Sequence, residues 1–170
     1  SKQSLYAAYP SKRALYEAVV RDWVDLGFDA MAPHTRALAG AADVRAGLLD
    51  LAGVRQAGVL SPPVLRMRTL VAAEAGAFPH VAADYVERSW NRNTGRLAEA
   101  LGELRDRGLL HVEDVDLAAE QFVWLVIGGP LNRLSLRGPE HGDADLRLHR
   151  IAAEAVDTFL SRYAVRTPPA

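Results

Sequence analysis

The residues with the clearest chemical potential lie near the start of the chain. Lys2 and Gln3 carry groups that fit base edges in the major groove of DNA, where lysine suits guanine and glutamine suits adenine. Ser4 and Tyr6 carry hydroxyl groups that can hold a phosphate. If residues 1–9 form a helix that enters the groove, these four side chains predict contact with duplex DNA.

Lys12 and Arg13 follow in the first turn of the next expected helix. The helix dipole and the free N–H groups there disfavour positive charge. A bound anion would offset this penalty, and a DNA phosphate is a suitable anion. The alternative is an ordinary exposed lysine, since the penalty is only about 0.3–1 kcal/mol.

Charge is distributed unevenly along the chain. The net charge is −1, which by itself does not indicate a nucleic-acid-binding protein. Residues 1–16 nevertheless carry +3 with no acidic residue, so the remainder carries −4. The positive charge is therefore concentrated where the DNA contacts are expected.

The composition is that of one ordinary domain. The 170 residues are 49% hydrophobic, enough to bury a substantial core. No apolar run approaches the roughly 18 residues needed to span a bilayer. The chain has no cysteine and does not begin with a signal-like segment. We therefore expect a cytoplasmic protein without disulfides.

Hydrophobic periodicity predicts helices almost throughout, with no alternating strand pattern, so the expected fold is all-α. Ser11 is the expected cap of a long helix that ends at Pro33. Ser61, before two prolines, begins another helix that runs to Gly76. Between them, a further helix is marked by the stripe Val44, Leu48, Leu51 and Arg55.

The second half of the chain predicts longer helices. A regular stripe favours one helix over residues 78–107, bent near Gly95 and stopped by Gly108. Its positions are Val86, Trp90, Asn93, Leu97, Leu101 and Leu104. Asp114 is the expected cap of a strongly apolar helix, which should kink or break at Pro130.

The last two helices predict a homodimer interface. The final helix, capped by Asp143, has a seven-residue repeat of the coiled-coil type, and two adjacent glycines permit close approach of another backbone. The expected interface residues are Gly128, Gly129, Leu146, His149, Ala153, Val156 and Leu160. The alternative is that both helices only complete the core of one subunit.

A set of large or polar side chains interrupts the apolar helix faces, as in mostly apolar pockets with a few polar anchors. The set is Trp23, Met31, Met67, Trp90, Asn93 and Trp124. We expect these residues to bind a small, largely apolar molecule. The alternative is that each packs in the core, with Asn93 hydrogen-bonded internally.

The sequence contains no complete set of residues for a catalytic site or a metal site. His141, Asp145 and His149 occur at four-residue intervals, but no cysteine or further close carboxylate completes a usual metal site. Glycine-rich phosphate loops and the H-E-x-x-H and G-x-S-x-G patterns are absent. We expect no enzymatic activity, no cofactor and no metal.

The run S-K-Q-S-L-Y-A-A-Y-P-S-K-R-A-L-Y-E-A-V resembles the end of the helix-turn-helix in the tetracycline-repressor (TetR) family of bacterial regulators. The family pattern is close to S-K-G-T-L-Y-x-x-F-x-S-K-E-x-L. The resemblance implies that Tyr6 and Lys12 touch phosphate. It also implies that bases are faced by Lys2, Gln3, Ala7 and Ala8. Ala8 stands where the family often has histidine, which leaves hydrogen-bonded base readout to Lys2 and Gln3.

Two later segments are similar to the C-terminal domain of an AefR-like branch of this family. They read L-R-M-R-T-L-V-A-A-E-A-G-A-F-P-H-V-A and D-V-D-L-A-A-E-Q-F. Residues 1–28 are then the C-terminal part of the DNA-binding domain, with the recognition helix at 1–8. Residues 29–170 are the ligand-binding and dimerisation domain. We expect the two helices that the family places before the recognition helix to be missing from this chain.

The resemblance implies a function for the whole chain. It implies a ligand-responsive transcriptional regulator, expected to be a repressor, that binds operator DNA as a homodimer. A small, largely apolar effector would release it from the DNA. The alternative is a helical small-molecule-binding or dimerisation module that does not bind DNA.

Overall fold

The computed structural model describes residues 9–137 and 147–165, and these form an all-α fold as expected. The helices are α2 (Lys12–Ala39), α3 (Val44–Val59), α4 (Pro62–Glu74), α5 (Pro79–Tyr85), the π-helix η1 (Val86–Asn91), α6 (Arg92–Asp106), α7 (Val115–Arg137) and α8 (Leu148–Tyr163). Within the described residues, β-type pairing is limited to an isolated bridge between Leu110 and Ala164.

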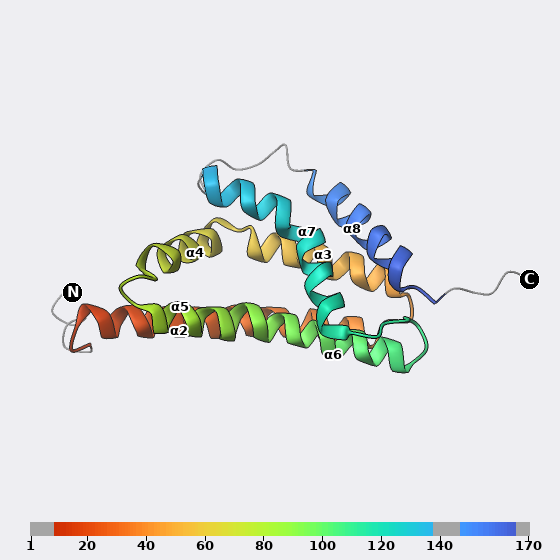
Figure 1. Ribbon diagram of the computed structural model, residues 1–170, viewed down its shortest axis with the longest axis horizontal. Coiled ribbons are helices and arrows are strands. Elements are labelled where there is room, and N and C mark those ends of the chain that lie inside the picture. The colour runs from red at the N-terminus through yellow and green to blue at the C-terminus, as the bar shows by residue number, and fades with distance from the viewer. Residues whose placement is uncertain (1–8, 138–146, 166–170) are drawn as a thin grey trace, which may run out of the picture.

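The helices form two layers (Figure 1). α2 runs along one side of the molecule, beside the nearly collinear series of α5, η1 and α6. α3, α7 and α8 pack against one another above this pair, and α4 connects the layers. α2 contacts both α3 and α6, so it is a structural element of both layers.

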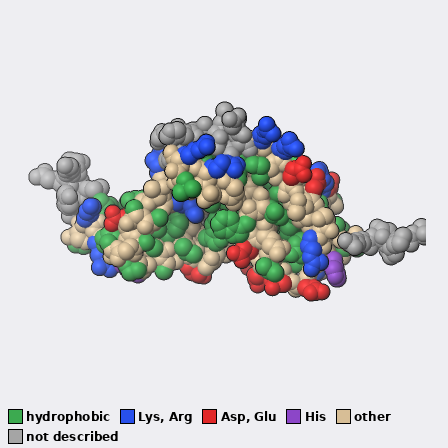
Figure 2. Space-filling view, turned by 45° about the horizontal axis from the view of Figure 1, so that its top comes forward, with side chains coloured by type: hydrophobic (Ala, Val, Ile, Leu, Met, Phe, Trp, Pro, Cys, Tyr) green, Lys and Arg blue, Asp and Glu red, His purple; other side chains and the backbone are tan. Residues whose placement is uncertain are grey.

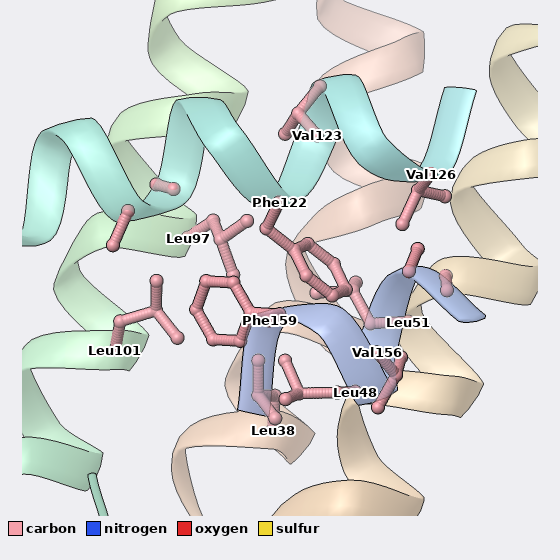
Figure 3. Packing of buried hydrophobic residues seen from close by; sticks show 14 of the residues in the cluster. Leu38, Leu48, Leu51, Leu97, Leu101, Phe122, Val123, Val126, Val156 and Phe159 are labelled. Atoms are coloured by element: carbon pink, nitrogen blue, oxygen red, sulfur yellow. The ribbon is translucent and has the colours of Figure 1, made fainter. Parts of the chain in front are cut away.

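The larger hydrophobic cluster fills the space between α3, α6, α7 and α8 (Figure 3). Its fully buried members include Leu38, Leu48, Leu51, Leu97, Leu101, Phe122, Val123, Val126, Val156 and Phe159. The rings of Phe122 and Phe159 meet edge to face with centroids 5.2 Å apart. Removal of this apolar surface from water is the main force that holds the helices together.

A smaller hydrophobic cluster joins the first half of α2 to α4 and α5. Its buried members are Val20, Val24, Met67, Val71, Val81 and Tyr85. Tyr16 and Phe78 pack on its edge with ring centroids 5.2 Å apart. This cluster fixes the N-terminal half of α2 to the rest of the molecule.

Helix α2 begins as predicted and ends later than predicted. The Ser11 hydroxyl oxygen accepts a hydrogen bond from the Ala14 N–H at 3.1 Å, so the predicted cap is confirmed. The predicted end at Pro33 is wrong, because α2 continues to Ala39. Leu38 and Ala39 beyond the proline are buried, and their packing outweighs the roughly 3 kcal/mol that an internal proline costs.

Helices α3 and α4 form where the stripes predicted them. The Asp43 carboxylate accepts from the Ala46 N–H at 3.0 Å and caps α3, which extends to Val59. Ser61 precedes α4 without capping it, because its hydroxyl donates instead to the Gly58 carbonyl at 2.7 Å.

The helix predicted over residues 78–107 departs from α geometry earlier than expected. The irregularity is the π-helix η1, whereas Gly95 lies inside the regular helix α6. A π-helix has a wider turn, which changes the side chains that face inward. As a result Tyr85 is buried, and Val86 from the predicted stripe is 49% exposed. Gly108 stops the helix as predicted, in the left-handed conformation with φ of 72°.

Helix α7 is capped by Asp114, whose carboxylate accepts from the Leu117 N–H at 2.9 Å. Of the kink or break predicted at Pro130, the break does not occur, since α7 continues to Arg137. Its ribbon changes direction along its course in Figure 1, as a kinked helix does. Pro130 and Leu131 are buried, so packing again compensates for the proline. The predicted cap Asp143 lies outside the described residues.

Two polar side chains tie the larger cluster together. The buried Gln56 amide nitrogen donates to the carbonyl of Val126 at 3.2 Å and to that of Leu148 at 3.1 Å. It therefore links α3 to both α7 and α8. The Arg107 guanidinium donates to the carbonyls of Ala39 and Ala41, which joins the end of α6 to the end of α2.

Candidate functional site

A cavity of about 300 Å³ lies between α2, α3, α4 and the α5–η1–α6 series. This volume is at the lower end of the range for small-molecule sites, roughly 300–1,000 Å³. The cavity borders both hydrophobic clusters. Val24 and Tyr85 belong to the smaller cluster, and Val59 and Trp90 pack against the larger one.

The walls of the cavity are mainly aromatic and aliphatic. Trp23 and Met31 come from α2, and Trp90 comes from η1. The Trp90 ring has the Arg68 guanidinium 5.8 Å from its centroid. Trp124 of α7 packs on the same ring with centroids 5.2 Å apart. These surfaces suit a flat, largely apolar molecule.

The neutral polar side chains of the cavity are bonded within the protein. The Ser89 hydroxyl donates to the Tyr85 carbonyl at 2.7 Å, and the Asn93 amide nitrogen donates to the Ser89 carbonyl at 2.7 Å. Burial raises the pKa of the Tyr85 hydroxyl, and the nearby Arg68 partly offsets this increase. Tyr85 is therefore a neutral phenol at neutral pH.

Arg55 of α3 is a cavity residue that the sequence-based reasoning did not select. Its side chain is 4% exposed, and burial lowers its pKa to about 10, so it remains charged at neutral pH. Its Nε and Nη2 atoms have no hydrogen-bond partner among residues 9–137 and 147–165. The available signal was its position in the stripe with Leu48 and Leu51, which places a cation on a buried helix face.

The structure brings together four of the six predicted effector residues. Trp23, Met31, Trp90 and Asn93 all line the cavity. Met67 does not line it and lies in the smaller cluster. Trp124 does not line it either, but packs behind Trp90 and is 48% exposed.

Most of the predicted DNA-binding residues lie outside the described residues. Those outside are Lys2, Gln3, Ser4, Tyr6, Ala7 and Ala8. Lys12 is exposed at the first position of α2, which has no acidic residue in its first turn. One turn later, the Glu17 carboxylate lies 2.9 Å from Arg13 Nε and 2.7 Å from His80 Nε2, and so ties α2 to α5.

The predicted interface residues on α8 face in several directions. Val156 is fully buried in the larger cluster, and Leu160 packs against that cluster. His149 is exposed and Ala153 is partly exposed, whereas Leu146 lies outside the described residues. Part of the seven-residue stripe, Val156 and Leu160, therefore belongs to the subunit's own core.

Helix α7 carries the more exposed apolar surface. Leu117 is 48% exposed, Leu125 is 41% exposed and Leu136 is 79% exposed. Gly129 is exposed, whereas Gly128 has a packing role within the chain, because a Cβ there would lie 3.0 Å from the Trp124 ring. Gly128 thus gives Trp124 room to lie along α7.

In residues 9–137 and 147–165, no helix combines the length and hydrophobicity that a membrane-spanning segment requires. In the same ranges, no three His, Cys, Asp or Glu side chains come together as metal ligands.

Residues 46–165 match the family model described as the C-terminal domain of AefR-like transcriptional repressors. This match covers well over half of the chain. The chain belongs to the TetR family of transcriptional regulators. This match confirms the family resemblance of the sequence. TetR-family proteins bind DNA and effectors, and they are regulators rather than enzymes.

Two solved structures of this family are similar to the chain. One is a protein from Mesorhizobium loti MAFF303099 described as a TetR-family transcriptional regulator, with 27% identity and a TM-score of 0.91. The match covers 97% of this chain and 81% of that one. The other is the flavonoid-responsive regulator FrrA, with 28% identity, a TM-score of 0.73 and coverage of 98% and 82%. No curated protein sequence matches the chain significantly.

Proposed function

We propose that this TetR-family regulator is a repressor that binds operator DNA as a homodimer and is released by a small, largely apolar effector. The observation that supports this proposal most is that the cavity is built on α2, which follows directly on the segment expected to read DNA. The cavity residues from α2 are Trp23, Val24, Gly27, Ala30 and Met31.

Helix α2 is a direct mechanical link between the cavity and the DNA-binding end. Trp23 lies about 16 Å along the helix from Lys12, at about 1.5 Å per residue. An effector that binds one position of α2 better than another shifts the protein toward that position. In a dimer this change alters the spacing of the two recognition helices, and a few kcal/mol of differential binding is enough to release the operator.

The DNA-binding end is assigned to residues 1–28, with residues 1–8 as the recognition helix. Lys2 and Gln3 would read bases, while Tyr6 and Lys12 would hold phosphates. The exposed position of Lys12 at the capped start of α2, without a neighbouring acidic residue, supports the phosphate role. Residues 29–170 would then form the effector-binding and dimerisation domain.

The effector is proposed to be a small molecule with an apolar, aromatic body. The tryptophan and aliphatic walls of the cavity support this assignment. The similar structure FrrA is described as flavonoid-responsive, which gives a precedent for a small-molecule signal in a related fold.

The dimer is proposed to form through α7 and α8 of two copies. Exposed leucines along α7 support this role, because a lone subunit would leave them in water. Hydrophobic side chains reach the surface among charged ones on the face shown in Figure 2. Gly129 and His149 are exposed on these two helices and remain candidate interface residues.

A Lys12→Ala substitution in the full-length protein tests the DNA-binding role. We expect it to weaken binding to all duplex sequences similarly and to lower the slope of log affinity against log salt by about 1, because one phosphate contact is lost. Electrophoretic mobility shifts with DNA upstream of the protein's own gene measure the effect. Arg36→Ala is the matched control, since Arg36 is an exposed cation in the last turn of the same helix.

Two outcomes would contradict the proposal at different levels. An unchanged salt slope in the Lys12→Ala protein would remove Lys12 from the phosphate contacts. A wild-type protein with no salt-sensitive affinity for any duplex, or one that is strictly monomeric, would favour a small-molecule-binding module that does not bind DNA.

A further inference from the structure

The cavity contains a buried positive charge that no acidic side chain among the described residues matches. The described lining includes the cations Arg55 and Arg68 and no aspartate or glutamate. Arg68 approaches the Tyr85 hydroxyl and the Trp90 ring, so it has partners within the protein. Arg55 is 4% exposed, and two of its nitrogens lack a partner among the described residues. Such a group is costly to bury unless something else satisfies it.

The unsatisfied atoms of Arg55 identify the kind of group that fits. Nε and Nη2 lie on one edge of the guanidinium. Both atoms are fully buried in this structure, so the Arg55 side chain must turn toward the cavity before their N–H bonds reach the two oxygens of one carboxylate. The same protein shows this pairing elsewhere. Arg45 donates from Nε to one Asp157 oxygen at 2.9 Å and from Nη2 to the other at 3.2 Å.

We propose that the effector is an aryl carboxylate, with its carboxylate held by Nε and Nη2 of Arg55 and its aromatic body against Trp23 and Trp90. This inference rests on the proposed role of the cavity as the effector site. It adds a charged anchor to an otherwise apolar ligand, and it explains why a charged arginine stands on the buried face of α3.

The rest of the lining favours a single carboxylate over a phosphate. A phosphate presents three terminal oxygens and more negative charge, and so needs more donors than one arginine edge. The other polar side chains have partners already, because Ser89 and Asn93 donate to backbone carbonyls. The volume of about 300 Å³ also limits the ligand to a small aromatic acid.

The test compares acids with their neutral isosteres. Benzoate, 2-naphthoate and biphenyl-4-carboxylate are each titrated against the matching carboxamide, with binding to the full-length protein measured by calorimetry. Wild type should prefer at least one carboxylate over its amide by about tenfold or more, since hydrogen bonds between two charged groups are stronger than those to a neutral amide. Equal affinity for acid and amide throughout the series would overturn the proposal.

Variants of Arg55 test whether this side chain causes the preference for the carboxylate over the carboxamide. Arg55→Met keeps the length and apolar stem of the side chain and should abolish the preference for the acid. Arg55→Lys keeps the charge without the two-donor edge and should retain only part of it. Arg45→Met is the control, because Arg45 is outside the cavity and should leave the preference intact. An unchanged preference in folded Arg55→Met protein would also overturn the proposal.

Folding of the key variant is checked by thermal unfolding. We expect Arg55→Met to be at least as stable as wild type without ligand, since an unsatisfied buried cation is removed. A large loss of stability would show that Arg55 is satisfied within the protein, and this would count against the proposal.

Failure of this inference is distinguishable from failure of the proposed function. If neutral aromatic compounds release the protein from DNA and carboxylates have no advantage, the repressor model stands and the carboxylate site is rejected. If Arg55 binds aryl carboxylates but DNA affinity does not change, the site stands and the effector role of the cavity is rejected.

Discussion

The two hydrophobic clusters differ in what surrounds them. The larger cluster, between α3, α6, α7 and α8, contains many fully buried side chains and is closed by the buried Gln56. The smaller cluster, between α2, α4 and α5, has six buried members among the described residues. It is bordered by the cavity and has the ion pairs of Glu17 at its outer end. A closely packed region transmits force but does not readily change shape.

This difference indicates where the molecule can respond to a ligand. The cavity lies where the two clusters meet, so a ligand there touches the firmly packed body on one side and the first half of α2 on the other. The Asp25 carboxylate adds a further link, because it accepts from Arg88 of η1 at 2.7 Å. The smaller cluster is thus the better candidate for rearrangement, and the larger one for the fixed reference.

The largest expected effect comes from a break in the larger cluster. Phe122→Ala removes a fully buried ring that packs against Phe159, and should lower the free energy of unfolding by about 3–5 kcal/mol. Chemical denaturation monitored by circular dichroism measures this change. Leu26→Ala is the control, since Leu26 is 69% exposed and its loss should have little effect. A cost under about 1 kcal/mol for Phe122→Ala would mean that this cluster is not closely packed.

A smaller and more local effect is expected from the smaller cluster. Met67→Ala should cost about 2 kcal/mol, at the low end for such a substitution, because Met67 belongs to the smaller cluster, which borders the cavity. Hydrogen exchange should quicken in the first half of α2 and in α5, while α7 keeps its protection. Leu70→Ala on the same helix is the control, since Leu70 is 42% exposed. Uniform loss of protection in all helices would show that the clusters unfold as one unit.

The smallest effect is expected from the exposed ion pairs at the start of α2. Hydrogen bonds from Arg13 and, second, from His80 hold the pKa of the Glu17 carboxyl below its ordinary value of 4.5. A lowered folded-state pKa gives stability that is complete above the ordinary value and is lost as the pH falls through the lowered one. Glu17→Gln should therefore have a lower melting temperature than wild type at pH 7. This difference should start to shrink as the pH falls below about 4.5 and should vanish below the lowered pKa of Glu17.

Melting curves of the two proteins across this pH range measure the effect. Glu103→Gln is a suitable control, because Glu103 is exposed on α6, away from α2's first turn. A difference that persists unchanged in acid would show that the ionised carboxylate of Glu17 is not what stabilises α2.

Local signals in the sequence were sufficient for much of the fold. The side-chain caps at Ser11 and Asp114 and the glycine stop at Gly108 are properties of a few neighbouring residues, and the structure confirms each of them. The two proline signals had different outcomes, because Pro33 does not end its helix, whereas the helix that contains Pro130 changes direction without a break (Figure 1). Their local cost is real, but it is outweighed by the burial of residues beyond them, which only tertiary packing determines.

The candidate site was predictable in part. Trp23, Met31, Trp90 and Asn93 could be selected because large or polar groups interrupt apolar stripes, and the fold brings them to one cavity. Arg55 was visible in a stripe but could not be recognised as an unsatisfied cation. Its state depends on which side chains other helices bring near it, and among the described residues no carboxylate lines the cavity. The register change in η1, which exposes Val86, has no local sequence signature that we can identify.

The placement of the aromatic residues makes the molecule its own optical sensor. The chain has three tryptophans; Trp23 and Trp90 line the cavity, and Trp124 packs on the Trp90 ring. All of its indole fluorescence therefore originates at the cavity or in direct contact with its wall. Occupancy of the cavity in unlabelled protein should be readable from emission wavelength and quenching, and energy transfer from these indoles would report on an aromatic ligand at once.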